Sequence, residues 1–163
     1  MMNELITAIE AMDPENLAYA IVTSASILAI IAFSVLIRYL MIAIGHSKMY
    51  RKAGVAGWKA FIPVYNTYNN YKISWNRETF IVFVALNCVL NSLGGAETLV
   101  PQLAAVVTGI TLIAVMIKQN VMMANLFGKG KGTGIALMFF PGITSLILGL
   151  GKAEFQAQIP ENV

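Results

Sequence analysis

The chain has 163 residues, of which 58% are hydrophobic and 12% are charged, whereas soluble domains are about half apolar and about a quarter charged. The apolar residues form long blocks that leave little polar surface to cover a globule, so the composition disfavours a soluble fold and indicates a membrane protein. The net charge of +3 comes from loops in the pattern that membrane insertion produces, which disfavours nucleic acid as a partner.

The first apolar segment follows an acidic N-terminal stretch. Residues 1–16 contain four acidic side chains and no lysine or arginine, and residues 17–37 form an apolar run of 21 residues. About 20 residues are enough to cross the hydrocarbon core of a bilayer. A secretory signal peptide has a basic start and a shorter apolar core. We therefore predict an uncleaved transmembrane helix over residues 17–37.

Residues 46–76 are basic and aromatic, and they are too polar to span a bilayer. Pro63 breaks this stretch, because proline has no backbone N–H and its ring clashes with the preceding turn. Tryptophan and tyrosine side chains on both sides of Pro63 suit the depth of the lipid headgroups, where a ring can be apolar at its body and wet at its tip. The segment predicts a broken amphipathic connector at the membrane surface, made of two short pieces.

Three further apolar runs follow the connector. Residues 79–93 form a short run, residues 99–117 a longer one, and residues 133–150 a run with Pro141 near its middle, which predicts a kink. Asn87 and Asn91 are four residues apart and so share one helix face, which we expect to turn toward other helices. The fold class predicted is all-α integral membrane, a single domain over residues 1–163 with four transmembrane helices.

The basic residues predict the orientation. Nine of the eleven lysines and arginines fall in two loops, residues 45–78 and residues 118–132. Lysine and arginine in short loops stay on the cytoplasmic side of a membrane. We therefore predict a protein of the cytoplasmic (inner) membrane, with both basic loops inside and both termini outside.

Two motifs resemble a known family. The sequences KAGVAGWKAFIPVYNTY at residues 52–68 and NLFGKGKGTGIALMFFPGITSLILGLGKAEF at residues 125–155 are similar to those of small, uncharacterised bacterial membrane proteins with four predicted spans. The resemblance implies the fold and the membrane location, and it implies no activity. This chain differs from the family mainly between residues 73 and 97. A signal-peptidase active site would need a serine and a lysine on the outer side of the membrane. The only lysine predicted on that side is Lys152, and it has no serine beside it.

The sequence offers no convincing catalytic, cofactor or metal site. Lys131 is followed by glycine rather than by serine or threonine, so the glycine- and lysine-rich turn fails the phosphate-loop pattern. His46 is the only histidine and has no acidic neighbour, so we interpret it as an interfacial residue. Cys88, the only cysteine, is interpreted as a packing residue. The predicted spans lack Asp, Glu, Lys and His, which disfavours ion-coupled transport.

The connector remains the best candidate for a functional segment. Basic and aromatic side chains suit anionic lipid of the inner leaflet. We expect Tyr65, Asn66 and residues 68–70 to form a polar cluster packed against the inner ends of the spans and the turn at residues 126–132. The candidate contacts with lipid or a partner are Lys52, Trp58, Lys59, Tyr65, Asn66, Tyr68, Asn69, Lys129 and Lys131. The function predicted is that of a non-enzymatic membrane protein that assembles with itself or a membrane partner. The alternatives are a homo-oligomeric pore lined by Asn87 and Asn91, and an enzyme acting on a lipid, for which only His46 and Glu78 are available.

Overall fold

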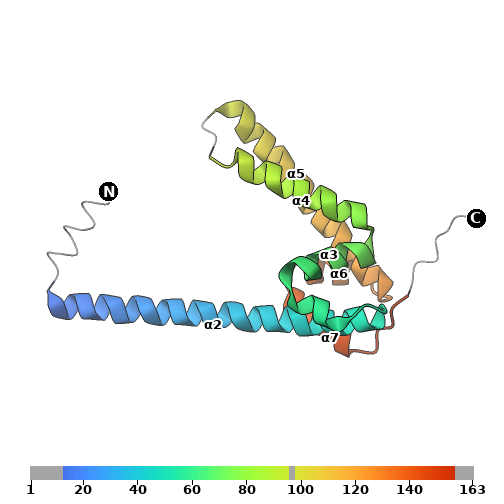
Figure 1. The fold of residues 1–163 in the computed structure, drawn as a ribbon, viewed down its shortest axis with the longest axis horizontal. Helices are drawn as coiled ribbons and strands as arrows, with labels where there is room; N and C mark the ends of the chain where they lie inside the picture. Colours follow the sequence, from blue (N-terminus) through green and yellow to red (C-terminus); the bar gives the residue numbers. More distant parts are fainter. Residues whose placement is uncertain (1–12, 96–97, 157–163) are drawn as a thin grey trace, which may run out of the picture. The chain divides into compact units, whose positions relative to one another are not determined.

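The computed structural model describes residues 13–95 and 98–156, which are helical and contain no strand (Figure 1). The predicted all-helical fold is therefore confirmed for this part of the chain. The chain divides into two compact units, Met1–Arg38 and Tyr39–Val163. Helix α2 (Pro14–Lys52) runs through the boundary between these units, and each unit is described here by itself.

The first unit is the apolar part of α2. All its side chains from Ile21 to Arg38 are exposed, and four hydroxyl groups in this stretch bond to carbonyl oxygens of their own helix, as Thr23 does to Tyr19 and Ser34 to Ile30. A helix in lipid must satisfy its polar groups internally. This surface suits contact with acyl chains.

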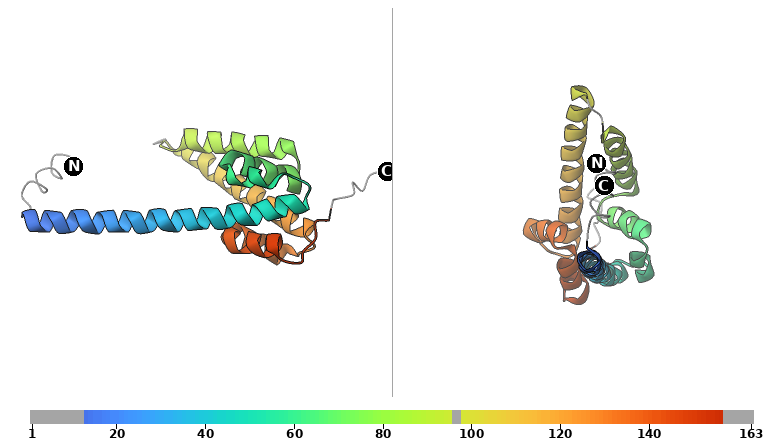
Figure 2. Two further views of the ribbon diagram at one scale, coloured as in Figure 1. Left: turned by 60° about the horizontal axis from the view of Figure 1, so that its bottom comes forward. Right: turned by 90° about the vertical axis from the view of Figure 1, so that its left-hand side faces the viewer.

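The described part of the second unit consists of helical segments joined by short turns (Figure 2). They are the end of α2, η1 (Gly57–Phe61), α3 (Pro63–Ser74), α4 (Arg77–Leu93), α5 (Leu99–Leu126), α6 (Lys131–Phe139) and α7 (Pro141–Leu150). Helix α5 carries α4, α6 and α3 against it, and α3 also contacts α4. The core consists of Met49, Met123, Leu126, Phe127, Leu137 and Leu148.

The connector begins later in the chain than predicted, and it is broken at the predicted position. Helix α2 continues to Lys52, past the predicted start at residue 46, and ends in a turn at Gly54, whose φ of 73° favours glycine. The 3-10 helix η1 ends at Phe61 and α3 begins at Pro63. Proline is tolerated at the first position of a helix because the N–H it lacks would have no partner there. The two predicted pieces, meeting at Pro63, are confirmed.

The prediction of four spans is not supported. Two helices, α2 and α5, are long and apolar enough to cross a membrane. Only 6% of the most apolar stretch of each is buried, unlike the core helix of a soluble domain. By their length and composition, these two helices suggest a membrane protein. Helix α4 has 17 residues, which is at the short end of the range of about 17–25 residues for a span.

The predicted fourth span, residues 133–150, is divided into α6 and α7. Phe140 leaves the helical conformation with φ −124° and ψ 57°. The reason is the following residue, Pro141, because a proline ring disfavours the α-helical conformation in the residue before it. The kink expected at this proline is a complete break.

Candidate functional site

A buried polar cluster joins the end of α2 to α3, and we take it as the candidate functional site. His46 Nδ1 lies 2.8 Å from Asn66 Oδ1. The Tyr50 hydroxyl lies 2.6 Å from the same oxygen and 2.7 Å from the Asn66 carbonyl, so its proton is shared between two acceptors. Asn70 Nδ2 lies 3.4 Å from His46 Nδ1. The cluster fastens α3 onto α2 through side chains that carry no formal charge.

His46, interpreted from the sequence as an interfacial residue because it has no acidic neighbour, has a buried side chain in the structure. It is 7% exposed, and its ring stacks on that of Tyr50 at 5.9 Å. The residue lies nine positions beyond the apolar run of residues 17–37. Burial lowers the pKa of His46 to about 4, and the bond to Asn66 offsets part of this shift. The ring is therefore neutral at pH 7, with its proton on Nδ1 facing the Asn66 oxygen.

A second set of contacts links the cluster to α5. Ser74 donates its hydroxyl proton to the Asn70 carbonyl at 2.6 Å, and Gln119 donates to Ser74 Oγ at 3.3 Å. Gln119 and Ser74 are both buried. The polar contacts Asn70–Ser74–Gln119 thus connect α3 to α5, and the bonds of Asn66 to His46 and Tyr50 connect α3 to α2. One acceptor in this set, Asn70 Oδ1, is buried without a partner.

Sequence reasoning predicted Asn66 but missed its two partners, His46 and Tyr50, and also missed Gln119, which bonds Ser74. His46 and Tyr50 are four residues apart and so share a helix face, a signal that would have paired them had α2 been extended past residue 45. Gln119 lies just beyond the predicted end of the third span, in a part of α5 that remains helical to Leu126. The hydrogen bonds of this cluster to other helices involve α2 and α5, and its predicted packing against the turn at residues 126–132 stays a prediction.

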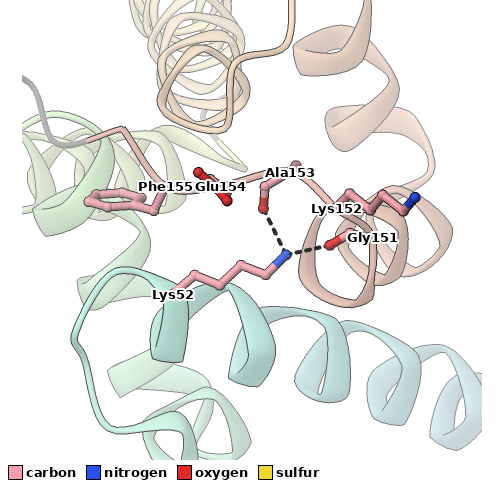
Figure 3. Close-up of a pocket in the computed structure, with 6 residues that line it drawn as sticks. All are labelled: Lys52, Gly151, Lys152, Ala153, Glu154 and Phe155. Carbon is pink, nitrogen blue, oxygen red and sulfur yellow. Dashed lines mark hydrogen bonds between the residues drawn. The ribbon is translucent and has the colours of Figure 1, made fainter.

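Lys52, at the end of α2, contacts the end of α7 and the segment that follows it (Figure 3). Its ammonium group donates to the carbonyl oxygens of Leu148 at 2.8 Å, Gly151 at 2.7 Å and Ala153 at 2.8 Å. An ammonium group has three protons, so all of them are used. The positive charge also suits the C-terminus of α7, where the helix dipole is negative. An open cavity of about 360 Å³ lies beside this group, lined by Lys52 and residues 151–155. Lys52, predicted to contact lipid, instead caps α7.

Replacing Lys52 with methionine is expected to destabilise the protein by about 2 kcal/mol, because hydrogen bonds to charged groups contribute roughly 1.5–3 kcal/mol and one of the three acceptors is exposed. Thermal unfolding in detergent, followed by tryptophan fluorescence, measures the effect. The matched control is Lys152→Met, which removes an exposed ammonium group and should leave the unfolding temperature unchanged. Equal shifts in both variants would show that charge, rather than the cap, matters.

The other predicted contacts divide into exposed and buried side chains. Trp58 and Tyr65 are exposed and their rings are 5.8 Å apart, with the half-buried Lys59 next to Trp58. Together with Phe61, Ile62 and Val64, which are also exposed, Trp58 and Tyr65 form what we call the connector patch. Lys129 and Lys131 are exposed at the turn between α5 and α6.

Tyr68 and Asn69 make contacts inside the second unit. The Tyr68 ring packs edge-on against Phe80 of α4 at 5.4 Å. Asn69 is buried, and its amide donates to the Tyr65 carbonyl one turn earlier at 2.6 Å. These side chains hold α3 in place, so the surface that α3 offers to lipid comes from its first residues.

Asn87 and Asn91 were predicted to form interhelical contacts. In α4 the Asn87 amide donates to the Phe83 carbonyl and the Asn91 amide to the Asn87 carbonyl, each at 2.8 Å. Both bonds lie within one helix. A contact between copies of the chain at these residues stays a prediction. Cys88, interpreted as a packing residue, is exposed on the same helix.

The described residues offer no group of three or more His, Cys, Asp or Glu side chains that could hold a metal ion. The chemistry of the site is hydrogen bonding by neutral amides, a phenol and a neutral imidazole. It can hold helices together and can bind a polar group.

No curated protein and no solved structure matches the chain. A family model does match it, over residues 58–158, and its description is a family of unknown function, DUF5684. The match contains all of the second sequence motif and the latter part of the first. It also covers η1 except for its first residue, and the helices α3 to α7. The chain therefore belongs to the DUF5684 family of unknown function.

Proposed function

We propose that the chain is a non-enzymatic protein of the bacterial inner membrane, which assembles with itself or with a membrane partner and whose connector binds anionic lipid of the inner leaflet. The observation that carries the lipid contact is the connector patch. Five neighbouring apolar and aromatic side chains, Trp58, Phe61, Ile62, Val64 and Tyr65, are exposed on η1 and the start of α3.

Such a patch suits the boundary between headgroups and acyl chains. Tryptophan and tyrosine place an apolar ring in the acyl region and a polar tip in the headgroup region. The patch also lies between basic residues, because Arg51, Lys72 and Arg77 are exposed on either side of it in the chain. Each basic residue near an anionic surface contributes about 1 kcal/mol to membrane attraction. Apolar insertion and charge attraction thus favour the same leaflet.

The proposed orientation places the basic loops in the cytoplasm. Lysine and arginine in short loops remain on that side during insertion, and exposed Lys129 and Lys131 agree with the connector in this respect. The N-terminal stretch, which is acidic, then lies outside.

The lipid contact can be tested through Trp58. The chain has two tryptophans, so a Trp75→Phe variant leaves Trp58 as the only fluorophore. In liposomes, we expect lipids brominated high on the acyl chain to quench Trp58 more strongly than lipids brominated near the chain end. Brominated phosphatidylglycerol should quench more than brominated phosphatidylcholine at equal mole fraction, because the former is anionic.

The control variant is Lys59→Gln with Trp75→Phe, which should lower the preference for the anionic lipid while leaving the depth profile unchanged. Trp58 that is quenched by aqueous iodide and not by brominated lipid would contradict the proposal. Quenching without any preference between the two headgroups would retain the interfacial position and reject the anionic specificity.

A further inference from the structure

Helix α6 begins, and helix α7 ends, on the same side of the second unit. Helix α6 starts at Lys131, five residues after α5 ends at Leu126. It then packs against α5, and a Cβ added to Gly134 would lie 2.5 Å from the Cα of Val121. The backbones of the two helices are thus in direct contact close to the C-terminal end of α5.

Helix α7 returns along the last turns of α2 (Figure 2). A Cβ added to Gly45 would lie 2.2 Å from Ser145 Oγ, and a Cβ added to Gly149 would lie 2.9 Å from the Cβ of Lys48. Lys52 then reaches the carbonyl oxygens at the end of α7. Residue numbers rise together on both helices, so α7 runs parallel to α2 and ends where α2 ends.

The segment after α7 leads back to the end of α5. The backbone N–H of Gln156 donates to the Leu126 carbonyl at 2.6 Å, and the ring of Phe155 packs on that of Phe127 at 5.6 Å. Leu126 and Phe127 lie at the end of α5, immediately before the turn that leads into α6. The chain therefore comes back to the point from which α6 departs.

The lengths of the two helices match one leaflet. Helix α6 has nine residues and α7 has ten, so at ~1.5 Å per residue each is about 15 Å long, roughly half of a ~30 Å hydrocarbon core. At the bend between them, Phe140 N donates to Ala136 O and Thr144 N donates to Phe140 O. The first of these bonds closes the last turn of α6 and the second opens the first turn of α7.

We infer that α6 and α7 form a re-entrant hairpin, which enters and leaves the membrane on the side of the basic loops and does not cross it. Acyl chains of that leaflet cover its apolar surface, where Phe139, Phe140, Ile143, Ile147 and Leu150 are exposed. Residues 151–156 then lie on the same side as residues 128–131. This arrangement reverses the predicted outer location of the C-terminal end.

The distribution of charge supports the inference independently of the coordinates. A fourth crossing would leave Lys152 on the outer side, opposite the basic loops. With a re-entrant hairpin, Lys152 joins the nine basic residues of residues 45–78 and 118–132, and Arg38 lies at the edge of the same side. All eleven lysines and arginines then agree with the positive-inside rule.

Single-cysteine labelling of the full chain tests the inference. In a Cys88→Ser background, cysteine replaces Thr98 at the start of α5, Lys129 at the turn after α5, or Glu154 after α7. Spheroplasts are treated with a membrane-impermeant maleimide before and after permeabilisation. We expect the Glu154→Cys and Lys129→Cys variants to react only after permeabilisation and the Thr98→Cys variant to react before it.

The deciding result is whether Glu154→Cys behaves like Lys129→Cys or like Thr98→Cys. Agreement with Thr98→Cys would mean that α6 and α7 cross the membrane and would overturn the inference. The comparison holds for either orientation of the protein, so it is independent of the proposed function. A Lys152→Cys variant gives a second reading at an exposed position, and it should match Lys129→Cys.

Discussion

Replacement of Gly45 by leucine is expected to separate α7 from α2 and to prevent the second unit from forming a stable, monodisperse protein in detergent. A Cβ at this position would lie 2.2 Å from Ser145 Oγ, 2.6 Å from the Ser145 carbonyl carbon and 2.7 Å from the Leu146 nitrogen. Two of these atoms belong to the backbone of α7 and cannot move aside by a rotamer change. Forcing extra groups into a packed interior costs roughly 1–3 kcal/mol, and alanine alone should reach the upper part of this range.

Size-exclusion chromatography and thermal unfolding measure the effect. For a chain of this length, each kcal/mol corresponds to about 2–4 °C in unfolding temperature. We therefore expect Gly45→Ala to lower it by several degrees and Gly45→Leu to give aggregated protein.

Gly109→Ala is the matched control. Gly109 also lies inside a helix, α5, but a Cβ there would meet nothing within 4 Å. Alanine forms helices better than glycine by about 1 kcal/mol, so this variant should be as stable as the original protein or more so. An unfolding temperature for Gly45→Ala equal to that for Gly109→Ala would show that the α2–α7 contact is absent.

Acidification is expected to destabilise the second unit through His46. Burial lowers the pKa of His46 from 6.5 to about 4, so the folded protein keeps the ring neutral while the unfolded chain takes up a proton below pH 6.5. The stability from the neutral ring is complete above pH 6.5 and is lost as the pH falls toward 4. One pKa unit corresponds to ~1.4 kcal/mol, which gives a loss of about 2 kcal/mol by pH 5 and about 3 kcal/mol by pH 4.

Chemical unfolding between pH 7.5 and pH 5 tests this expectation, since few carboxylates titrate in that range. The control is His46→Gln, which keeps an N–H near Asn66 and has no titratable group. Its stability should be lower than that of the original protein at pH 7.5 but nearly constant across the range. The explanation fails if the two proteins lose the same stability between these pH values.

Local features of the sequence predicted much of the fold. The apolar runs that became parts of α2 and α5 are continuous and long, and such runs can satisfy their backbone only as helices in lipid. Pro63 divides the connector as predicted because the effect of proline acts on adjacent residues. These predictions depend on neighbouring residues, so no knowledge of the tertiary structure was needed.

The structure of residues 133–150 could not be predicted from neighbouring residues in the same way. An apolar run with Pro141 in the middle describes both a kinked span and a bend with two half-length helices. The choice between them depends on contacts with distant residues, such as Gly45 against Ser145 and Gly134 against Val121. Helical periodicity carries no information about these pairs.

The candidate site was predicted in part for a similar reason. Asn66 stood out because an amide has no role in a simple interfacial segment, and it is the centre of the polar cluster. Lys52 was assigned to lipid because of its charge, whereas its ammonium group is held by carbonyl oxygens of α7. Charge predicts the side of the membrane on which a residue lies, but burial depends on which helix packs over it.

The bonds of Lys52 also set an order of events during synthesis. Its three acceptors lie 96, 99 and 101 residues later in the chain. At a synthesis rate of ~5–20 residues per second, the end of α2 emerges about 5–20 seconds before its partners do. During this interval Gly45 lacks the contact with Ser145 that it makes in the folded chain. The end of α2 therefore gains these contacts only after α7 has been made.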